Sequence, residues 1–295
     1  MNKLGVHALV WVGGWSHAEC ERAIAQSAEL GYDLIEIAAL DPSSIDGAFT
    51  RKMLDRYKIG TTMSLGLDES TDISSDDAGK MARGEARLMQ VLSVAREIGA
   101  THVCGILYSA FQKYFKPPTG KGIAGSVEVL RRVGEEAARH GITIGLEVVN
   151  RYETNVLNTA AQAVEFAGRV ALPNVKVHLD TYHMNIEEAD IEAAIIDCGD
   201  MLGYFHIGES GRGYLGAGNI DFDRVFRGLA KAHYKGPITF ESFSSAVVNE
   251  QLSGILGIWR NLWEDGADLA RHAKGFIESG MKAAEEAHAR SQRAQ

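Results

Sequence analysis

VKVHLD at residues 175–180 and LGYFH at residues 202–206 are two of four apolar stretches that end in a residue able to bind a metal ion. The other two stretches read ITIGLE at residues 142–147 and PITFE at residues 237–241. Each has the length and the β-branched or aromatic content of a buried strand. The sequence therefore predicts four potential metal ligands at the ends of four successive strands: Glu147, Asp180, His206 and Glu241.

The same alternation runs along the whole chain. Strands are predicted at residues 4–11, 34–38, 59–65, 102–107, 142–149, 175–179, 202–207 and 238–241. Segments with helical spacing lie between them, for example at residues 17–30, 80–98, 126–140, 159–170 and 222–232. Gly31, Gly99 and Gly141 each follow such a segment and are suited to the left-handed cap of a helix. Eight strand–helix units predict an α/β fold, a single closed (β/α)8 TIM barrel.

An open doubly wound sheet is the alternative to the barrel. Such a sheet normally carries a Gly-rich phosphate loop after its first strand, and the pair Gly13-Gly14 lacks that spacing. No linker rich in Pro, Gly or Ser divides the chain, so we expect one domain over residues 1–295. From about Lys282 the chain is rich in Ala and charged residues, which predicts a solvated, fraying helical tail.

Composition narrows the class of protein. Of the 295 residues 45% are hydrophobic, enough for a large core, and the net charge of −9 disfavours nucleic acid as a partner. No apolar stretch approaches the length of a membrane span, so no membrane partner is expected. Cys20, Cys104 and Cys198 cannot all pair, and Cys104 lies in an apolar run. A buried, reduced thiol and a cytoplasmic location are therefore predicted.

The four strand-end residues indicate metal-assisted chemistry. In a closed barrel the strand ends converge on one rim, and carboxylates with imidazole suit a divalent ion such as Mn²⁺, Mg²⁺ or Co²⁺. Glu147 and Glu241 lie roughly three strand–helix units apart and can reach the ion from different sides. One can then remove a proton from carbon while the other delivers a proton to the opposite face. The metal would chelate a carbonyl and its neighbouring hydroxyl and hold the enediolate that forms.

Three further residues are candidates for binding substrate. His183 follows Asp180 by three residues in HLDTYHMN, where a loop can bring its imidazole near the molecule bound to the metal. Arg212 lies in the glycine-rich loop 208–218, which we interpret as presenting it to sugar oxygens; a phosphate cradle is the alternative. Glu153 either bonds a substrate hydroxyl or is an ordinary exposed loop residue.

Other residues near the predicted strand ends have plainer interpretations. Glu36 is an active-site helper or, more in keeping with its position, a rim ion pair. His178 is a packed or supporting histidine, and Glu209 orients Arg212 or a metal ligand, or faces solvent. Four aromatic residues either wall a sugar pocket or belong to the core: Trp11, Trp15, Tyr108 and Phe111.

Four motifs together are similar to a known family. LEVVNRYE, LDTYHMN, FHIGESGR and GIWR closely resemble segments of ketose 3-epimerases of the D-tagatose 3-epimerase type, which include D-psicose (allulose) and L-ribulose epimerases. The resemblance extends over nearly the whole chain and implies a (β/α)8 barrel that binds a divalent metal, commonly Mn²⁺. It also implies a homodimer or homotetramer. The chain departs from the family pattern at His7, where Tyr or Phe is usual, and at Ser242, where Pro is common.

The resemblance also assigns roles to individual residues. It implies that the metal is held by Glu147, Asp180, His206 and Glu241. Glu147 and Glu241 would then be the acid/base pair. The residues implied to contact the sugar substrate are Glu153, His183 and Arg212.

The predicted activity is inversion of C3 of a free ketose, of the D-tagatose, D-psicose/D-fructose or L-ribulose type, through a metal-bound enediolate. An aldose–ketose isomerase on the same barrel is the first alternative, because the same ligands would serve a proton transfer between neighbouring carbons. A metal-dependent dehydratase of a cyclic polyol, a DNA-repair endonuclease of similar architecture and a non-catalytic sugar-binding barrel are further alternatives. The charge of −9 counts against the endonuclease.

Overall fold

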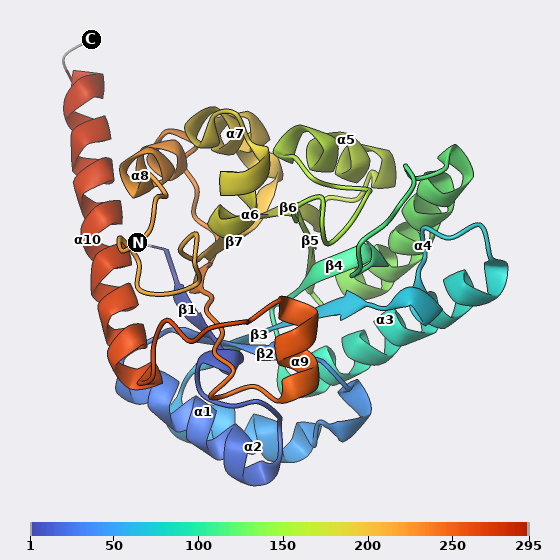
Figure 1. Cartoon of the computed structure of the whole chain (residues 1–295), viewed down its shortest axis with the longest axis horizontal. Helices are drawn as coiled ribbons and strands as arrows, with labels where there is room; N and C mark the ends of the chain where they lie inside the picture. Colours follow the sequence, from blue (N-terminus) through green and yellow to red (C-terminus); the bar gives the residue numbers. More distant parts are fainter. Residues whose placement is uncertain (1, 294–295) are drawn as a thin grey trace.

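A computed structural model describes residues 2–293 of the chain. Eight strands form a closed barrel in which neighbours are parallel and β8 pairs with β1. The strands are β1 Leu4–His7, β2 Leu34–Ala38, β3 Gly60–Leu67, β4 His102–Ala110, β5 Thr143–Glu147, β6 Val175–Asp180, β7 Leu202–Ile207 and β8 Ile238–Phe240. The predicted (β/α)8 barrel is confirmed, and in Figure 1 the helices surround the strands.

Most of the helices cover the outside of the barrel. They are α1 His17–Glu29, α2 Gly47–Tyr57, α3 Ala78–Ile98, α4 Gly120–Arg139, α5 Ala160–Val170, α6 Thr181–Glu187, α7 Ile191–Cys198, α8 Phe222–Lys231, α9 Glu250–Leu256 and α10 Gly266–Arg293. In Figure 1 the short α9 lies in front of the barrel, and the long α10 borders one edge beside α8. Four 3₁₀ turns complete the elements: η1 Ala8–Val10, η2 Pro42–Ser44, η3 Glu69–Thr71 and η4 Gly199–Met201.

Local sequence explains where the helices begin and end. Ser16 caps α1 by accepting a hydrogen bond from the backbone N–H of Glu19, while the Glu19 carboxylate accepts from the N–H of Ser16. The three predicted glycine caps are confirmed: Gly31, Gly99 and Gly141 have φ of 74°, 76° and 68°. This left-handed backbone is strained for other residues, so glycine ends these helices and turns the chain toward the next strand.

The predicted strands agree with the structure at β2 and β7 and differ most at β1. The first strand was predicted over residues 4–11, but β1 ends at His7 and a 3₁₀ turn follows. The turn forms because Nδ1 of His7 accepts a hydrogen bond from the backbone N–H of Leu9, at 3.3 Å. A side-chain cap of this kind competes with the strand ladder, and the apolar pattern alone does not reveal it.

Three other predictions can be compared with the structure. Cys20, Cys104 and Cys198 are all free and buried, and burial raises the pKa of the Cys104 thiol well above its ordinary value. The predicted tail from Lys282 forms the end of α10, where Ala284 is still buried; residues 294 and 295 lie outside the described part. Within residues 2–293 no helix is long and apolar enough to span a bilayer.

Strand register brings polar residues together at one end of the barrel. Asp180 of β6 lies opposite His206 of β7, and His7 of β1 lies opposite Glu36 of β2. Their side chains are nearly or fully buried, at 0–3% exposure. Because the strands are parallel and in register, these groups gather where the loops after the strands meet.

Candidate active site

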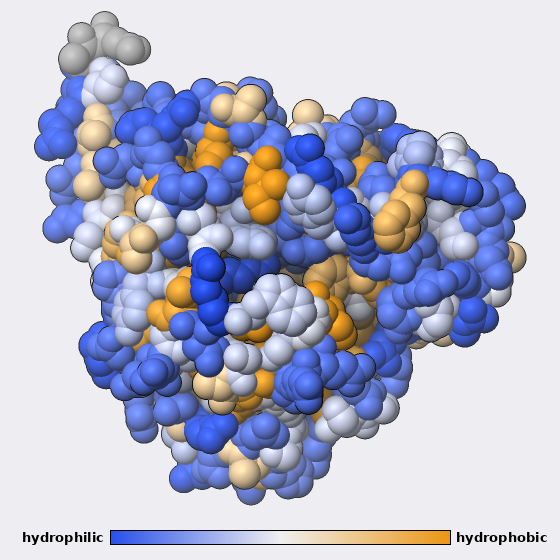
Figure 2. All heavy atoms as spheres, viewed as in Figure 1, coloured by the Kyte–Doolittle hydropathy of each residue, from blue (hydrophilic) through white to orange (hydrophobic). Residues whose placement is uncertain are grey.

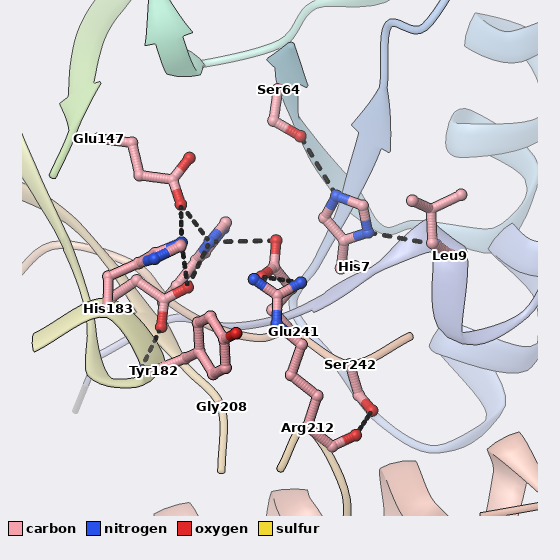
Figure 3. A network of polar contacts seen from close by, with 12 residues as sticks. His7, Leu9, Ser64, Glu147, Tyr182, His183, Gly208, Arg212, Glu241 and Ser242 are labelled. Carbon is pink, nitrogen blue, oxygen red and sulfur yellow. Dashed lines mark hydrogen bonds and ion pairs between the residues drawn. The ribbon is translucent and has the colours of Figure 1, made fainter. Parts of the chain in front are cut away.

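The four predicted ligands meet at the carboxyl end of the barrel. Glu147 and Asp180 end β5 and β6, His206 lies near the end of β7, and Glu241 directly follows β8. From Nδ1 of His206 the nearest carboxylate oxygens are 3.4 Å away on Glu241, 3.8 Å on Glu147 and 3.9 Å on Asp180. Figure 3 shows Glu147 and Glu241 reaching this point from different sides. The structure thus brings all four together.

The imidazole of His206 is oriented by Glu36. Nε2 of His206 lies 2.8 Å from a carboxylate oxygen of Glu36, which also accepts a 2.7 Å hydrogen bond from the Tyr204 hydroxyl. Burial would raise the pKa of Glu36, but the His206 imidazole beside it lowers that pKa below its usual range, so the carboxylate is ionised. Glu36 therefore accepts, Nε2 donates, and Nδ1 faces the three ligand carboxylates. Metal-bound histidines are commonly oriented by a carboxylate in this way.

The donor set fits a divalent cation. Nδ1 of His206 and Oδ2 of Asp180 are buried and have no hydrogen-bond partner among residues 2–293. Three of the four proposed ligands, Asp180, His206 and Glu241, have ligand atoms within 4.8 Å of one another. Buried polar atoms are normally paired, so unpaired atoms that converge on one point indicate a site for an ion. Oxygen and imidazole ligands suit Mn²⁺, Mg²⁺ or Co²⁺.

The carboxyl groups that meet at this point favour protons or a cation, because buried negative charges repel one another. Burial raises the pKa of Glu147 and Asp180, and it raises the pKa of Glu241 to about 8. Burial would lower the pKa of His206, but the carboxylates of Glu36 and Glu241 outweigh it and raise that pKa well above its ordinary value. Without metal, protons on these groups compensate part of the negative charge. A divalent cation would replace them.

His183 lies in a helix and not in the loop that was predicted. Asp180 caps α6 by accepting a 2.7 Å hydrogen bond from the backbone N–H of Tyr182, so the helix begins directly after β6. The cap places His183 in the first turn of α6, buried and directed into the site. Asp180 is itself the sequence signal for the start of α6, because Asp is a preferred N-cap residue. A role as a metal ligand does not predict this helix.

His183 and His206 both carry their proton on Nε2, but they turn opposite nitrogens toward the site. Nδ1 of His183 lies 3.2 Å from the backbone nitrogen and 2.9 Å from the side-chain nitrogen of Asn150. Both are donors, so Nδ1 accepts and the proton is on Nε2. That N–H points between Glu147 and Glu153, at 3.7 and 3.8 Å from their oxygens. Burial lowers the pKa of His183 well below its ordinary value, so it stays neutral. Geometry alone also groups it with Glu147 and Asp180, but a protonated Nε2 is a donor and not a ligand.

Arg212 is held over the site by two aromatic rings. Its guanidinium lies 4.2 Å from the ring centre of Tyr182 and 4.5 Å from that of Phe243, and 3.8 Å from Glu241. Burial would lower its pKa, but nearby carboxylates, Glu241 first, raise it. Glu153 lies in the loop after β5 and is largely buried, and burial raises its pKa. The interpretation of Glu153 as an ordinary exposed residue is therefore wrong.

The backbone of Arg212 is tied to the end of β8. Its φ of +56° is left-handed, which is uncommon outside glycine. The Ser242 hydroxyl donates a 2.6 Å hydrogen bond to the carbonyl of Arg212 and accepts one of 2.8 Å from the indole of Trp263. Glu209 organises the same loop through the backbone N–H of Ser210 and of Gly216, at 2.8 and 2.9 Å. Glu209 is buried, so its interpretation as a solvent-facing residue is wrong.

Of the two interpretations of Glu36, the rim ion pair is wrong and the active-site helper agrees with the structure. Glu36 is fully buried, faces the barrel interior and bonds His206. The signal was present in LIEIA, where a single charged residue stands between Ile35 and Ile37 on the opposite face of the strand. His178 is packed as expected, its ring 4.2 Å from that of His206 and edge-on to it.

A cavity of about 520 Å³ opens above these residues. His7 and Ser64, joined by a 3.2 Å hydrogen bond, form part of its wall opposite the binding residues. Phe111 lines this cavity, as one of the two interpretations predicts. Trp11 and Tyr108 belong to the core instead, where the Trp11 indole N–H donates to Ser27 and the Tyr108 hydroxyl donates to the carbonyl of Glu147. Figure 2 shows the molecular surface hollowed over the centre of the barrel.

Comparison with known proteins gives one consistent result. The family described as xylose isomerase-like TIM barrel matches residues 24–277. The chain is 46% identical to a ketose 3-epimerase of Arthrobacter globiformis, over 95% of this chain and 97% of the relative. It is 49% identical to an L-ribulose 3-epimerase of Methylomonas sp. strain DH-1, over 92% and 96%. A solved structure of D-allulose 3-epimerase from Methylomonas sp. with D-allulose has a TM-score of 0.93 at 48% identity, covering 94% of this chain and 96% of the other.

Proposed function

This chain belongs to the ketose 3-epimerases, within the family of xylose isomerase-like TIM barrels, and we propose that it inverts C3 of a free ketose by proton removal and return. The substrates named for its relatives are L-ribulose, D-psicose and D-allulose, the last two being one sugar. The proposed substrates are therefore ketoses of the L-ribulose, D-psicose/D-fructose or D-tagatose type. The observation that carries the proposal is the pair of buried carboxyl groups, Glu147 and Glu241, on two sides of one point.

Glu147, Asp180, His206 and Glu241 are the proposed metal ligands, with Mn²⁺ the preferred ion and Co²⁺ or Mg²⁺ the alternatives. A divalent cation bound there supplies Lewis acidity, which polarises the C2 carbonyl of the ketose and makes the C3–H acidic. Two observations support this assignment. The His206 imidazole is oriented by the hydrogen bond that its Nε2–H donates to Glu36, and its Nδ1 has no hydrogen-bond partner among residues 2–293.

Glu147 and Glu241 are the proposed acid/base pair. One carboxylate removes the proton from C3, and the other carboxyl group donates a proton to the opposite face. The reverse reaction exchanges these roles. Burial supports the assignment, because both carboxyl groups are at most 9% exposed and solvent is kept away from the carbon that exchanges its proton.

The remaining polar side chains are proposed to hold the sugar. The Nε2–H of His183 is a donor for a substrate oxygen, and the Glu153 carboxylate is an acceptor for a hydroxyl. The guanidinium of Arg212 compensates negative charge that develops on the substrate oxygens as C3 loses its proton. A free sugar is preferred over a sugar phosphate, because among residues 2–293 Arg212 is the one cationic side chain in the inner part of the cavity.

Two further parts of the proposal concern the molecule in solution. We propose a homodimer or homotetramer, in keeping with the family resemblance. A cytoplasmic location is proposed because the three cysteines are free and buried, as expected in a reducing compartment.

Turnover in D₂O tests the proposed reaction. Epimerisation of L-ribulose or D-fructose should place deuterium at C3 of the product, located by NMR after chromatographic identification. An aldose–ketose isomerase would place deuterium at C1 or C2 instead. Label confined to C1 or C2, with an aldose as product, would replace the epimerase proposal with the isomerase.

A further inference from the structure

The cavity is larger than a simple ketose needs. A ketohexose has about twelve non-hydrogen atoms, and covalently bonded atoms each occupy less than the roughly 30 Å³ of a water molecule in the liquid, so the sugar fills well under about 360 Å³. The cavity measures about 520 Å³. Space therefore remains after an unsubstituted sugar has occupied the part of the cavity next to Glu147 and Glu241.

The additional space lies at the mouth of the cavity. The inner wall carries the buried groups already described, whereas the outer wall is formed by the segment after β2, by Asp68 after β3 and by α9. Leu40 and Ile255 line this outer part and are 49% and 54% exposed. Gln251 of α9 and Arg87 of α3 add polar groups to the same wall. We refer to this region as the outer cavity.

The direction of the bound sugar follows from the placement of polar groups. Glu153, His183 and Arg212 all follow β5, β6 or β7 and lie beside the acid/base pair. The outer cavity is bounded by segments that follow β2 and β3 and by α9. A ketose whose C1–C3 end is held by the first group therefore directs its far terminus toward the outer cavity.

The chemistry of the outer cavity favours a neutral ring. The guanidinium of Arg87 lies 3.9 Å from a carboxylate oxygen of Asp41, and Asp68 adds a second carboxylate against this one cation. A dianionic phosphate would face an excess of negative charge there. The apolar side chains of Leu40 and Ile255, together with the amide of Gln251, match a sugar ring, which has apolar faces and a hydroxyl edge.

From these observations we propose that the outer cavity is a second sugar subsite, and that the enzyme also epimerises C3 of ketoses whose terminal hydroxyl carries a neutral glycosyl group. This inference depends on the proposed 3-epimerase function. The reaction at C3 is unchanged, one proton leaving and one returning, and the glycosidic bond stays intact. A substituent on the C6 hydroxyl leaves O5 free, so the ketose ring still opens to expose the C2 carbonyl.

The test compares D-fructose, 6-O-α-D-glucopyranosyl-D-fructose and D-fructose 6-phosphate as substrates of the metal-loaded enzyme. Products are identified by chromatography and NMR. The disaccharide should be converted to its C3 epimer with a kcat/KM within about tenfold of that for D-fructose, and the phosphate should be the poorer substrate of the two derivatives. Preference for the phosphate over the disaccharide would overturn the neutral subsite.

Two variants of α9 assign any disaccharide activity to the outer cavity. Gln251→Trp fills this space, and the ratio of kcat/KM for the disaccharide to kcat/KM for D-fructose should fall at least tenfold. Glu250→Trp is the matched control, because Glu250 is exposed on α9 and outside this cavity; its ratio should stay within twofold. An unchanged ratio in Gln251→Trp would overturn the proposed subsite.

The outcomes separate this inference from the function on which it rests. If free ketoses, L-ribulose included, are epimerised while the disaccharide is not, the second subsite is overturned and the 3-epimerase function stands. If no free ketose gives a C3 epimer, the proposed function itself fails and the inference fails with it.

Discussion

His206 of β7 donates its Nε2–H to Glu36 of β2 across the interior of the barrel, over 2.8 Å. Glu36 is held in turn by the Tyr204 hydroxyl, which accepts hydrogen bonds from Thr62 and Thr239, each at 2.7 Å. All of these groups are fully or almost fully buried. Glu36, which does not line the cavity, thereby determines which nitrogen of His206 faces the proposed metal site.

Glu36→Gln should weaken metal binding about 10- to 100-fold, the usual effect of losing a group that orients a ligand. The amide carries no charge and is a weaker acceptor for the His206 N–H. Competition with a metal indicator would measure the dissociation constant for Mn²⁺. Glu29→Gln, at an exposed position of α1, is the matched control and should bind Mn²⁺ normally. Equal affinity in both variants would show that the Glu36–His206 bond does not affect the metal.

The two histidines of the site should respond differently to substitution. His206→Ala should lose bound metal, because it removes a proposed ligand. His183→Ala should keep metal near one ion per chain, because its cavity-facing nitrogen carries the proton, and should lower kcat/KM. Arg212→Ala should behave like His183→Ala. Metal analysis beside kinetics distinguishes these cases; a metal-free His183→Ala together with a metal-loaded His206→Ala would reverse the two roles.

Glu147→Gln and Glu241→Gln should each reduce turnover by about 10²- to 10⁴-fold, the scale of a general acid–base group. Epimerisation needs both groups in either direction, so neither variant should retain a fast direction. Initial rates from both C3 epimers of one ketose would measure this. Glu165→Gln, at an exposed position of α5, is the control for loss of a carboxylate elsewhere. A near-native rate in either active-site variant would remove that residue from the pair.

Metal affinity should increase with pH up to about pH 8. In the unfolded chain Glu241 ionises near its ordinary pKa of 4.5, whereas in the folded, metal-free protein burial raises its pKa to about 8. The folded state therefore binds more protons across this interval, and the stability of the metal-free protein falls as pH rises through it. A divalent cation displaces the proton, so its stabilising effect grows over the same interval.

Calorimetry of Mn²⁺ binding in buffers of different ionisation enthalpy checks this prediction. At about pH 7 binding should release protons, and above about pH 8 the release from Glu241 should disappear. The Glu241→Gln variant should bind more weakly, with a smaller release at about pH 7. An affinity that does not change between about pH 6 and about pH 8 would contradict a protonated Glu241 in the metal-free protein.

Ser242→Ala should lower the free energy of unfolding by about 1–3 kcal/mol, because the buried N–H of Trp263 loses its acceptor. It should also lower kcat/KM, since the carbonyl of Arg212 loses the bond that fixes its left-handed backbone. Denaturant unfolding and kinetics measure the two effects. Ser245→Ala removes an exposed hydroxyl bond to Asn261 and serves as the control. Equal stability of the two variants would contradict this role of Ser242.

The fold and the proposed ligands could be predicted because each depends on a local pattern. A strand end is visible in a run such as VKVHLD, and the barrel then places all strand ends at one rim. The role of Glu36 could not be predicted in this way, since it depends on contact with a residue 170 positions away. The tautomers of His183 and His206 likewise depend on partners from other elements, Asn150 and Glu36. The turn after His7 was missed because a side-chain cap replaced strand pairing.

The proposed ligands all come from β5 to β8, whereas Glu36, His7 and Ser64 come from β1 to β3. The two halves of the chain thus contribute different parts of one centre: the carboxyl-terminal half carries the proposed metal donors, and the amino-terminal half carries Glu36, which orients His206, and one wall of the cavity. A chimaera that joined residues of β5 to β8 to the first half of another such barrel would retain every donor while acquiring a new wall. Such a chimaera would bind metal as tightly as this chain only if the incoming half also supplied a carboxylate at the position of Glu36 to orient His206.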